Sequence, residues 1–180
     1  MKKKILIVLG VLALIIVTFA MYIGAQPGKM EITRSAVMNA DASEVVAQVN
    51  DFSNWNDWSP WAKMDPNAKY EEEGPDSGVG SIMRWDGNEE VGKGSSRITK
   101  SVPNERIELD LVFEKPMEDV AQVVWVFEEA DGGVKVTWTM LNDLNFAGKA
   151  MSVFMDFDKM VGDQYEKGLM NIKEIVESDS

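Results

Sequence analysis

The sequence predicts an α+β fold, in which a long C-terminal helix covers an antiparallel sheet of six or seven strands and one apolar helix precedes the domain. Three observations predict it. Residues 5–24 form an uncharged apolar run, residues 68–141 are short β-like runs divided by turn signals, and residues 156–178 carry an apolar stripe at helical spacing. The length of 180 residues suits one ordinary domain, so we expect a single core.

The apolar run at residues 5–24, ILIVLGVLALIIVTFAMYIG, follows lysines at positions 2 to 4. A helix rises about 1.5 Å per residue, so this run could span a hydrocarbon core of roughly 30 Å. A cleaved signal peptide normally has a shorter apolar region and ends in small residues, whereas Ile23 occupies a position that should be small. This comparison favours an uncleaved anchor over a cleaved signal. Because the lysines should stay in the cytoplasm, we expect a single-pass membrane protein with its domain on the periplasmic or extracellular side.

The domain begins soon after this run, because Gln26-Pro27-Gly28 breaks the apolar helix. We assign residues 1–25 to the anchor or signal sequence, 26–29 to a linker and 30–178 to the domain. The first segment of the domain, MEITRSAVM at residues 30–38, has the β-rich composition of a strand. The domain should therefore sit close to the bilayer.

A short helix and a tryptophan-rich segment come next. Asp41 offers an N-cap for a helix over residues 42–52, where Val45, Val49 and Phe52 recur at helical spacing. The following stretch, NWNDWSPW, holds half of the six tryptophans. Its Asn, Asp and Ser-Pro residues predict a broken second helix or turn.

The strands of the sheet are predicted by alternation between turn signals. Ile107, Leu109, Leu111 and Phe113 alternate with charged residues, and the same period of two recurs over residues 134–140. Such alternation describes antiparallel strands with one buried and one solvated face. The turn signals are Gly74-Pro75-Asp76-Ser77-Gly78, Asp86-Gly87-Asn88, Val102-Pro103-Asn104-Glu105 and Asp131-Gly132-Gly133.

The end of the chain returns to helical spacing over residues 156–178, where apolar side chains recur every three or four positions. This helix needs an apolar surface to cover, and the apolar face of the sheet is the partner that the sequence provides. The stripe consists of Met160, Val161, Tyr165, Leu169, Ile172, Ile175 and Val176.

Composition excludes several classes of function. The chain has no Cys and no His, which removes thiol and imidazole catalysis and the usual zinc sites. All thirty Asp and Glu and fifteen of the eighteen Lys and Arg follow residue 4, which leaves this part with a formal charge of −15. A surface this negative repels nucleic acid. We therefore expect no cofactor, no metal and no nucleic-acid partner.

The three clustered tryptophans, Trp55, Trp58 and Trp61, have two interpretations. They could line the mouth of a cavity and present flat apolar walls to a ligand. They could instead fill the junction between the short helices and the sheet. We favour packing for Trp55 and Trp61 and regard Trp58 as the candidate for ligand contact.

The remaining candidate ligand contacts are apolar residues on the inward phase of the strands and on the last helix. Gly162 and Gly168 are suggestive, because glycine inside a helix costs about 1 kcal/mol relative to alanine. Gly168 could leave space for a ligand or allow close packing, and the methionines could form a pliable cavity wall or simply fill the core. The candidates are Met83, Trp85, Leu109, Leu111, Phe113, Trp125, Trp138, Met140, Met160, Tyr165, Gly168 and Leu169.

Polar candidates for chemistry are few. Arg84 could receive a carboxylate or enolate oxygen, and Tyr165 could donate a hydrogen bond into a cavity. A solvated strand charge and a tyrosine at the edge of the core are the competing interpretations. The two G-x-G runs open no helix, so they are not phosphate loops.

Six segments, in this order, resemble the bacterial polyketide cyclase/dehydrase-like branch of the START and birch-allergen superfamily, also called SRPBCC. The similarity covers roughly residues 31 to 177, nearly the whole part of the chain that follows the apolar run. The segments are NWNDWSPW at 54–61, GVGSIMRWDG at 78–87, VGKG at 91–94, ITKSVPNERI at 98–107, VTWTM at 136–140 and MDFDKMVG at 155–162.

This resemblance implies a helix-grip fold, a curved sheet gripping the last helix around a cavity that holds a hydrophobic molecule in many relatives. No invariant catalytic motif of the family carries over to residues of this chain, so activity stays open. We expect a membrane-anchored domain, held through residues 5–24, that binds an apolar small molecule or lipid. The alternatives are a cyclase or dehydratase acting on a polyketide-like or aromatic substrate through Arg84 and Tyr165, and an interaction protein whose cavity is filled by side chains.

Overall fold

The computed structural model describes residues 2–178, which form seven strands and six α-helices with one short 3-10 turn, η1. The helical elements are α1 (Lys2–Gly24), α2 (Ala42–Asn50), η1 (Phe52–Asn54), α3 (Trp55–Trp58), α4 (Pro60–Met64), α5 (Phe146–Phe154) and α6 (Phe157–Ser178). The strands are β1 (Lys29–Met38), β2 (Lys69–Glu73), β3 (Ile82–Asp86), β4 (Lys93–Val102), β5 (Arg106–Lys115), β6 (Asp119–Ala130) and β7 (Gly133–Asp143).

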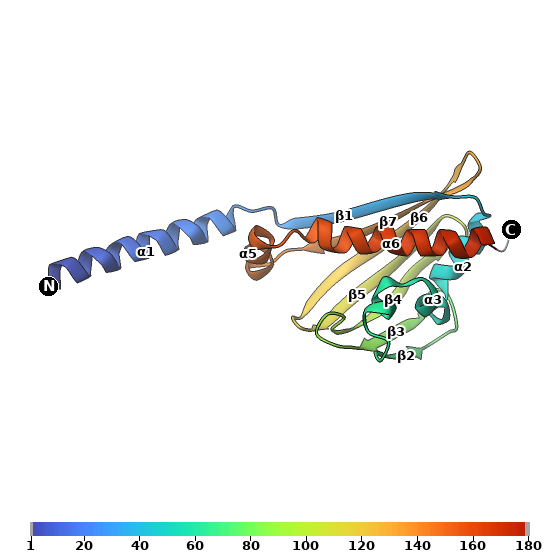
Figure 1. Ribbon diagram of the computed structural model, residues 1–180, viewed down its shortest axis with the longest axis horizontal. Coiled ribbons are helices and arrows are strands. Elements are labelled where there is room, and N and C mark those ends of the chain that lie inside the picture. Colours follow the sequence, from blue (N-terminus) through green and yellow to red (C-terminus); the bar gives the residue numbers. More distant parts are fainter. Residues whose placement is uncertain (1, 179–180) are drawn as a thin grey trace.

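The strands form one antiparallel sheet in the order β1-β7-β6-β5-β4-β3-β2. Hairpins join β3 to β4, β4 to β5, β5 to β6 and β6 to β7, and β1 closes the order by pairing with β7. The sheet curves around α6, which runs along its concave side (Figure 1). The short helices α3 and α4 cover the part of the same side near β3 and β4 (Figure 1). The predicted α+β helix-grip fold is confirmed.

The core lies between the concave face of the sheet and α6. The helix buries Tyr165, Leu169, Ile172 and Val176 on one face, the face that its apolar stripe predicted. Buried residues of β7 alternate with exposed or half-buried ones, as the period of two over residues 134–140 predicted, whereas β6 has three consecutive buried residues from Val123 to Trp125. No residue of α1 belongs to this core, so we expect residues 28–180 to fold without it.

Three local features differ from the predictions. The helix expected over residues 42–52 ends at Asn50, and Phe52 belongs to the 3-10 turn, whose Asp51 side chain accepts a hydrogen bond from the Ser53 backbone N–H. The connection from β5 to β6 passes through Pro116, a turn that the four predicted turn signals left out. The helix α5 was also not predicted. It begins where the Asn145 side chain accepts a hydrogen bond from the Gly148 backbone N–H, a cap of the usual kind.

An arginine on β1 fastens the start of α6 to the edge of the sheet. The Arg34 guanidinium donates to both carboxylate oxygens of Asp158, at 3.1 and 3.0 Å, and to Glu166 at 2.9 Å. A Cβ atom at Gly162 would overlap this guanidinium, so glycine at that position makes room for the ion pair. Gly162 therefore serves packing against Arg34.

This ion pair predicts an acid-dependent loss of stability. The hydrogen bond from Arg34 holds the pKa of Asp158 below its usual value of 3.8, so the pair stabilises the fold above that value and loses its effect as pH falls through the lowered pKa. We expect Arg34→Gln to lower the unfolding temperature at neutral pH and to flatten its decline below about pH 4. Thermal unfolding at a series of pH values measures this.

The matched control is Lys159→Gln, because Lys159 forms an exposed pair with Asp163 at 2.9 Å on the same helix. Such surface pairs contribute little, so the control should keep the acid profile of the unchanged chain. Identical profiles for the Arg34 variant and the unchanged chain would contradict the assignment.

The first helix, α1, extends away from the domain (Figure 1) and is long and apolar enough to cross a membrane. No residue in the most hydrophobic part of this helix is buried against the rest of the protein. It touches the domain only at its C-terminal end, where Ile23 is buried and Phe19 lies beside Phe154 of α5. The helix is therefore independent of the core and attached at one end of the domain.

Candidate functional site

An apolar cavity of about 280 Å³ lies between the sheet, the short helices α3 and α4, and the first half of α6. Apolar and aromatic side chains make up most of its wall. Ten of the residues predicted to contact a ligand line it: Trp58, Met83, Trp85, Leu109, Leu111, Phe113, Trp125, Trp138, Met140 and Tyr165. Eight of these ten lie on strands, so the strand periodicity identified about a third of the 23 residues that line the cavity.

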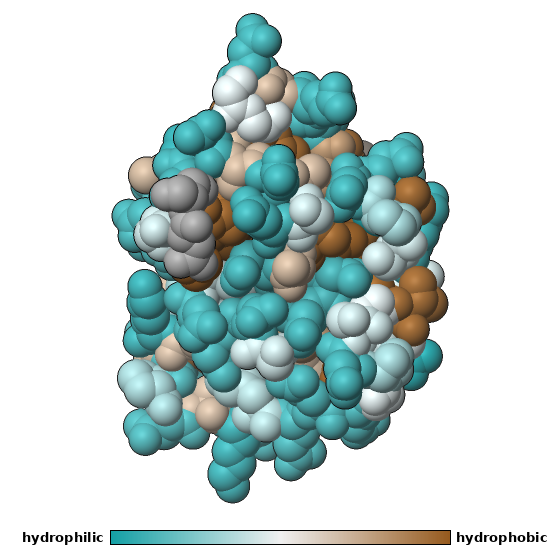
Figure 2. Space-filling view, turned by 90° about the vertical axis from the view of Figure 1, so that its right-hand side faces the viewer, coloured by the Kyte–Doolittle hydropathy of each residue, from teal (hydrophilic) through white to brown (hydrophobic). Residues whose placement is uncertain are grey.

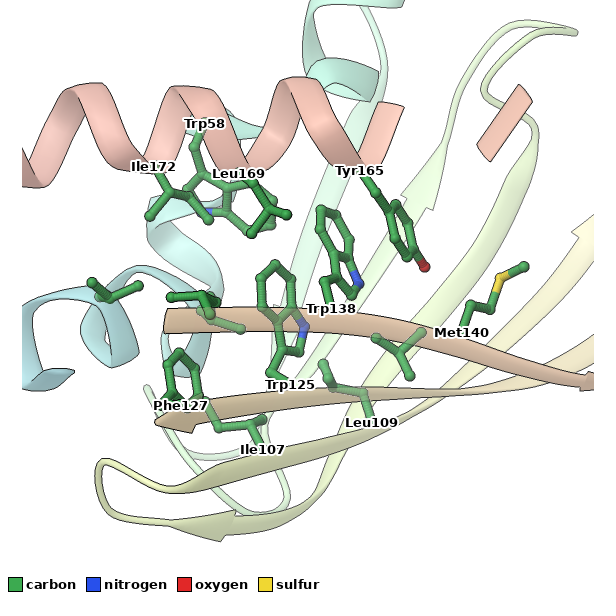
Figure 3. Packing of buried hydrophobic residues seen from close by; sticks show 14 of the residues in the cluster. Trp58, Ile107, Leu109, Trp125, Phe127, Trp138, Met140, Tyr165, Leu169 and Ile172 are labelled. Carbon is green, nitrogen blue, oxygen red and sulfur yellow. The ribbon is translucent and has the colours of Figure 1, made fainter. Parts of the chain in front are cut away.

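A stack of three aromatic rings forms one side of the cavity. Trp138 lies between Trp125 and Tyr165, with ring centroids 4.1 and 3.7 Å away and interplanar angles of 22° and 10° (Figure 3). Trp58 meets Trp125 and Trp138 edge to face, at 5.9 and 5.7 Å. Aromatic contacts of both kinds are favourable beyond their burial, so this stack is a rigid wall.

All three clustered tryptophans line the cavity, so packing for Trp55 and Trp61 and ligand contact for Trp58 stay predictions. Trp58 is fully buried, and its indole N–H donates to the Gln48 carbonyl oxygen at 2.9 Å, so it seals the junction of helices and sheet. Trp55 and Trp61 are half-buried, stack on each other at 6.1 Å and also line the cavity. The spacing of three residues could not show which ring turns inward, because a 3-10 turn and two very short helices orient each tryptophan separately.

Polar groups with unused hydrogen bonds lie in the wall near α3. The Trp55 indole N–H and the Tyr70 hydroxyl are buried and neither forms a well-formed hydrogen bond, although the two lie close together. The Trp138 N–H is also unpaired, because it lies in the plane of a ring stacked parallel to Tyr165 and cannot point at the Tyr165 oxygen. Buried polar groups normally have partners, so these three are available to a ligand.

Burial keeps both cavity tyrosines protonated. It raises the pKa of Tyr165, which is almost completely enclosed, and it raises that of Tyr70 to a smaller degree with help from the negative Asp65. A phenol in this state donates a hydrogen bond and is a poor base. The prediction that Tyr165 serves as a donor toward the cavity stays a prediction.

The other end of the cavity carries an amide and a carboxylate. The Asn142 side-chain N–H donates to Asp119 at 2.7 Å, and the Asn142 carbonyl oxygen is buried without a partner. Both residues line the cavity, at the ends of β6 and β7 that lie nearest to α1. This pair offers acceptors to a hydroxyl or amine of a ligand.

Four predicted site residues lie outside the cavity wall. A Cβ atom at Gly168 would lie 2.9 Å from the Trp138 ring, so this glycine allows α6 to pack closely on the stack and leaves no space for a ligand. Leu169 is buried in the core beside it. Met160 is exposed on the outer side of α6. Gly168 and Leu169 therefore serve packing in the core, and Met160 is outside the wall because it is exposed to solvent.

The fourth is Arg84, which faces away from the cavity. Its guanidinium donates to Glu73 on the neighbouring strand at 2.8 Å and lowers the pKa of that carboxylate. Neighbouring positions on a strand point to opposite faces, so Arg84 turns outward while Met83 and Trp85 turn inward. The geometry matches the interpretation of Arg84 as a solvated charge on a strand. The cyclase or dehydratase alternative therefore loses the residue that was expected to bind the substrate oxygen.

Several wall residues were not among the predicted ligand contacts. Asp119 begins β6 immediately after the unpredicted turn, so no alternation identified it as inward. Tyr70 lies on β2, a strand of five residues with three consecutive glutamates and no clear period. Met30, Phe157 and Val161 line the end of the cavity nearest to α1. Their position in the wall depends on where α6 begins relative to β1. The spacing of apolar residues along the sequence does not predict this arrangement.

Among residues 2–178, no group of His, Cys, Asp and Glu side chains is placed to hold a metal ion.

Solved structures of this shape come from several bacterial proteins. The chain is similar to protein CV1439 from Chromobacterium violaceum, with 16% identity over 84% of this chain and 99% of that one and a TM-score of 0.59. The Aha1 dimer protein from Colwellia psychrerythraea is similar at 16% identity, 82% and 96% coverage and a TM-score of 0.59. These likenesses show the fold.

A third similar structure is the di-domain ARO/CYC protein StfQ from the steffimycin biosynthetic pathway, at 11% identity and a TM-score of 0.62. The match covers 84% of this chain and 51% of that one. No curated protein matches the sequence significantly. The family model described as polyketide cyclase/dehydrase and lipid transport matches residues 29–177, so the chain belongs to that family.

Proposed function

We propose that this protein is a membrane-anchored domain that binds a hydrophobic small molecule or lipid between its sheet and its last helix. The observation that carries the proposal is the apolar cavity of about 280 Å³ in the centre of the domain. Interiors are normally packed with few voids larger than a water molecule, so a cavity of this size in a natural core suggests a guest.

The wall suggests which guest fits. The volume lies near the lower end of the range for drug-sized ligands, which favours a compact ring system or a single chain over a two-chain lipid. The N–H of Trp55 and the hydroxyl of Tyr70 would serve an acceptor at one end of the guest, and the Asn142 oxygen would serve a donor at the other. Asp119 and the acidic domain disfavour an anionic guest.

Support for the anchor comes from α1. The helix is apolar, unpacked along most of its length and preceded by lysines, which favours a membrane span with a cytoplasmic N-terminus. The link from Gly24 to Lys29 is short, so the anchored domain would stay next to the bilayer.

The test fills the cavity. Val123 lines the cavity on β6, and Val120 on the same strand is 61% exposed on the opposite face. We expect Val123→Phe to weaken binding of the neutral fluorophore N-phenyl-1-naphthylamine to residues 28–180 about tenfold, because the added ring occupies the volume of the guest. Val120→Phe is the matched control and should bind as the unchanged domain does. Energy transfer from tryptophan to the fluorophore measures the affinity.

Native mass spectrometry of the purified domain gives a second readout. We expect a bound apolar molecule that leaves when the sample is unfolded. A mass without any guest, together with equal fluorophore binding by both variants, would contradict the proposal and support a cavity filled by side chains in solution.

A second candidate function is an enzyme of the cyclase or dehydratase type. The observation that favours it is that the carboxylate of Asp119 lines the same cavity as the protonated Tyr70 and Tyr165. A carboxylate could accept a proton while a phenol donates one, as proton transfer across a bound substrate requires. The two functions separate by the fate of the guest, since a binding protein returns it unchanged and a dehydratase returns it without the elements of water.

A further inference from the structure

The helix α5 has the features of a segment that lies on a membrane. It runs FAGKAMSVF, none of its residues is buried, and Phe146 and Phe154 are 57% and 75% exposed. Its one charged residue is Lys149, although the domain around it is strongly acidic. Large apolar side chains on a charge-poor helix cost free energy in water and stabilise insertion at a bilayer surface.

The contacts of α5 with α1 set its depth. The Phe154 ring lies 6.2 Å from the ring of Phe19, and the Lys149 amine donates to the Gly24 carbonyl oxygen at 3.2 Å. Phe19 is five residues before the end of α1, which is about 7.5 Å along the helix axis. If α1 spans the bilayer, Phe154 lies at the depth of roughly 5–10 Å at which interfacial helices bury their apolar face. The Lys149 amine then lies at the surface, as a lysine at a membrane boundary does.

A groove beside this surface adjoins the cavity. It has a volume of about 570 Å³ and runs between α5, the start of β1 and the start of α6. Pro27 and Phe154 line its outer part, while Met30 and Phe157 line both the groove and the cavity. Met30 and Phe157 are half-buried, as are Tyr70 and Phe113 elsewhere in the wall, whereas Val49, Phe52 and Trp58 are buried at the end away from α1. The two shared residues are therefore the part of the wall that separates the cavity from the groove.

The opposite end of the domain has a different surface. Hydrophilic residues cover most of the face that points away from α1, with hydrophobic residues scattered among them (Figure 2). The exposed phenylalanines of α5 lie at the other end of the domain, beside α1.

We propose that α5 lies in the bilayer interface and that the groove beside it is the route by which the guest passes between the bilayer and the cavity. The inference rests on the proposed function. The groove is also lined by the three carboxylates of Glu31, Asp156 and Asp158 against the single cation Lys29. We therefore take the partner surface to be a neutral or zwitterionic bilayer, because this excess of negative charge repels anionic head groups.

The location of α5 can be tested on the full chain, because the sequence has no cysteine and accepts single labels. The variants are Phe154→Cys and, as a control, Val79→Cys, a residue 58% exposed in the loop between β2 and β3 at the far end of the domain. Both carry an NBD fluorophore and are reconstituted in phosphatidylcholine vesicles containing nitroxide-labelled lipid. We expect quenching severalfold stronger at position 154 than at position 79, and equal quenching would overturn the inference.

The route is tested by the rate of transfer. N-phenyl-1-naphthylamine is loaded in phosphatidylcholine vesicles that hold the full chain, and energy transfer from tryptophan follows its arrival in the cavity. We expect Phe146→Asp to slow this arrival about tenfold, because a carboxylate on α5 resists insertion into the interface. Val79→Asp is the matched control and should leave the rate unchanged. Equal rates for the two variants would overturn the route.

The two proposals fail in different ways. A domain 28–180 that binds no fluorophore contradicts the proposed function, whatever the quenching at position 154. A domain that binds the fluorophore while position 154 remains unquenched contradicts only the interfacial placement of α5.

Discussion

Replacing Trp138 by alanine is expected to lower the free energy of unfolding of residues 28–180 by about 3–5 kcal/mol. Trp138 is buried between Trp125 and Tyr165 and also contacts Trp58 and Trp61, so its removal empties the centre of the aromatic wall. The packed helix α6 and the sheet limit collapse into the space, and a large uncollapsed cavity gives the upper part of the range. Urea denaturation followed by circular dichroism measures the loss.

The matched variant is Trp138→Phe, which keeps a ring against Tyr165. Because stacking is retained and less volume is removed, its loss should be clearly smaller than that of the alanine variant. Equal losses in the two variants would show that ring stacking does not hold this wall together. A loss below about 1 kcal/mol for alanine would show that α6 can close on the sheet without it.

The second large effect is expected at Gly94 on β4. A Cβ atom there would overlap the Val112 carbonyl oxygen and lie 2.5 Å from the Trp85 ring. Gly94 also borders an irregularity in the pairing of β4 with β5, so neither strand can shift without disturbing the ladder. We expect Gly94→Ala to cost about 3 kcal/mol or more and to displace Trp85 from the cavity wall. Urea denaturation measures the loss of stability, and the affinity for the fluorophore shows whether the cavity wall at Trp85 has changed.

The neighbouring variant Ser95→Ala serves as the control, because it keeps a Cβ atom and its side chain points to the other face of the sheet. Its change in stability should stay within about 0.5 kcal/mol. If Gly94→Ala is as mild as Ser95→Ala, the close approach of β4 to Trp85 is not required for folding.

The fold could be predicted from the sequence because its determinants are periodic and local. The alternation at Leu109 and Leu111 and the stripe through Leu169 and Ile172 each follow from the geometry of one element. Once a long helix and a sheet each carry one apolar face, covering the sheet with the helix is the natural arrangement. Those same patterns identified the strand residues at the centre of the cavity wall, which are eight of its 23 residues.

The rest of the site depends on contacts between elements, which periodicity does not encode. Trp58 turns inward and Trp55 remains half-buried because a 3-10 turn and short helices rotate them independently. Gly168 is needed because a Cβ atom there would lie too close to the ring of Trp138, which is thirty positions earlier in the chain. The helix α5 has too few residues for a clear stripe, and its two exposed phenylalanines acquire a meaning only beside α1.

The aromatic wall also gives the domain an optical property. Five of the six indoles touch one another around the cavity, two of them nearly parallel at 4.1 Å and others almost perpendicular. Chromophores this close share their excited states, so near-ultraviolet light reads the cluster as one unit rather than as separate rings. A bound molecule that tilts one indole would change the near-ultraviolet spectrum of the whole cluster. Binding could therefore be followed on the unlabelled protein without an added dye.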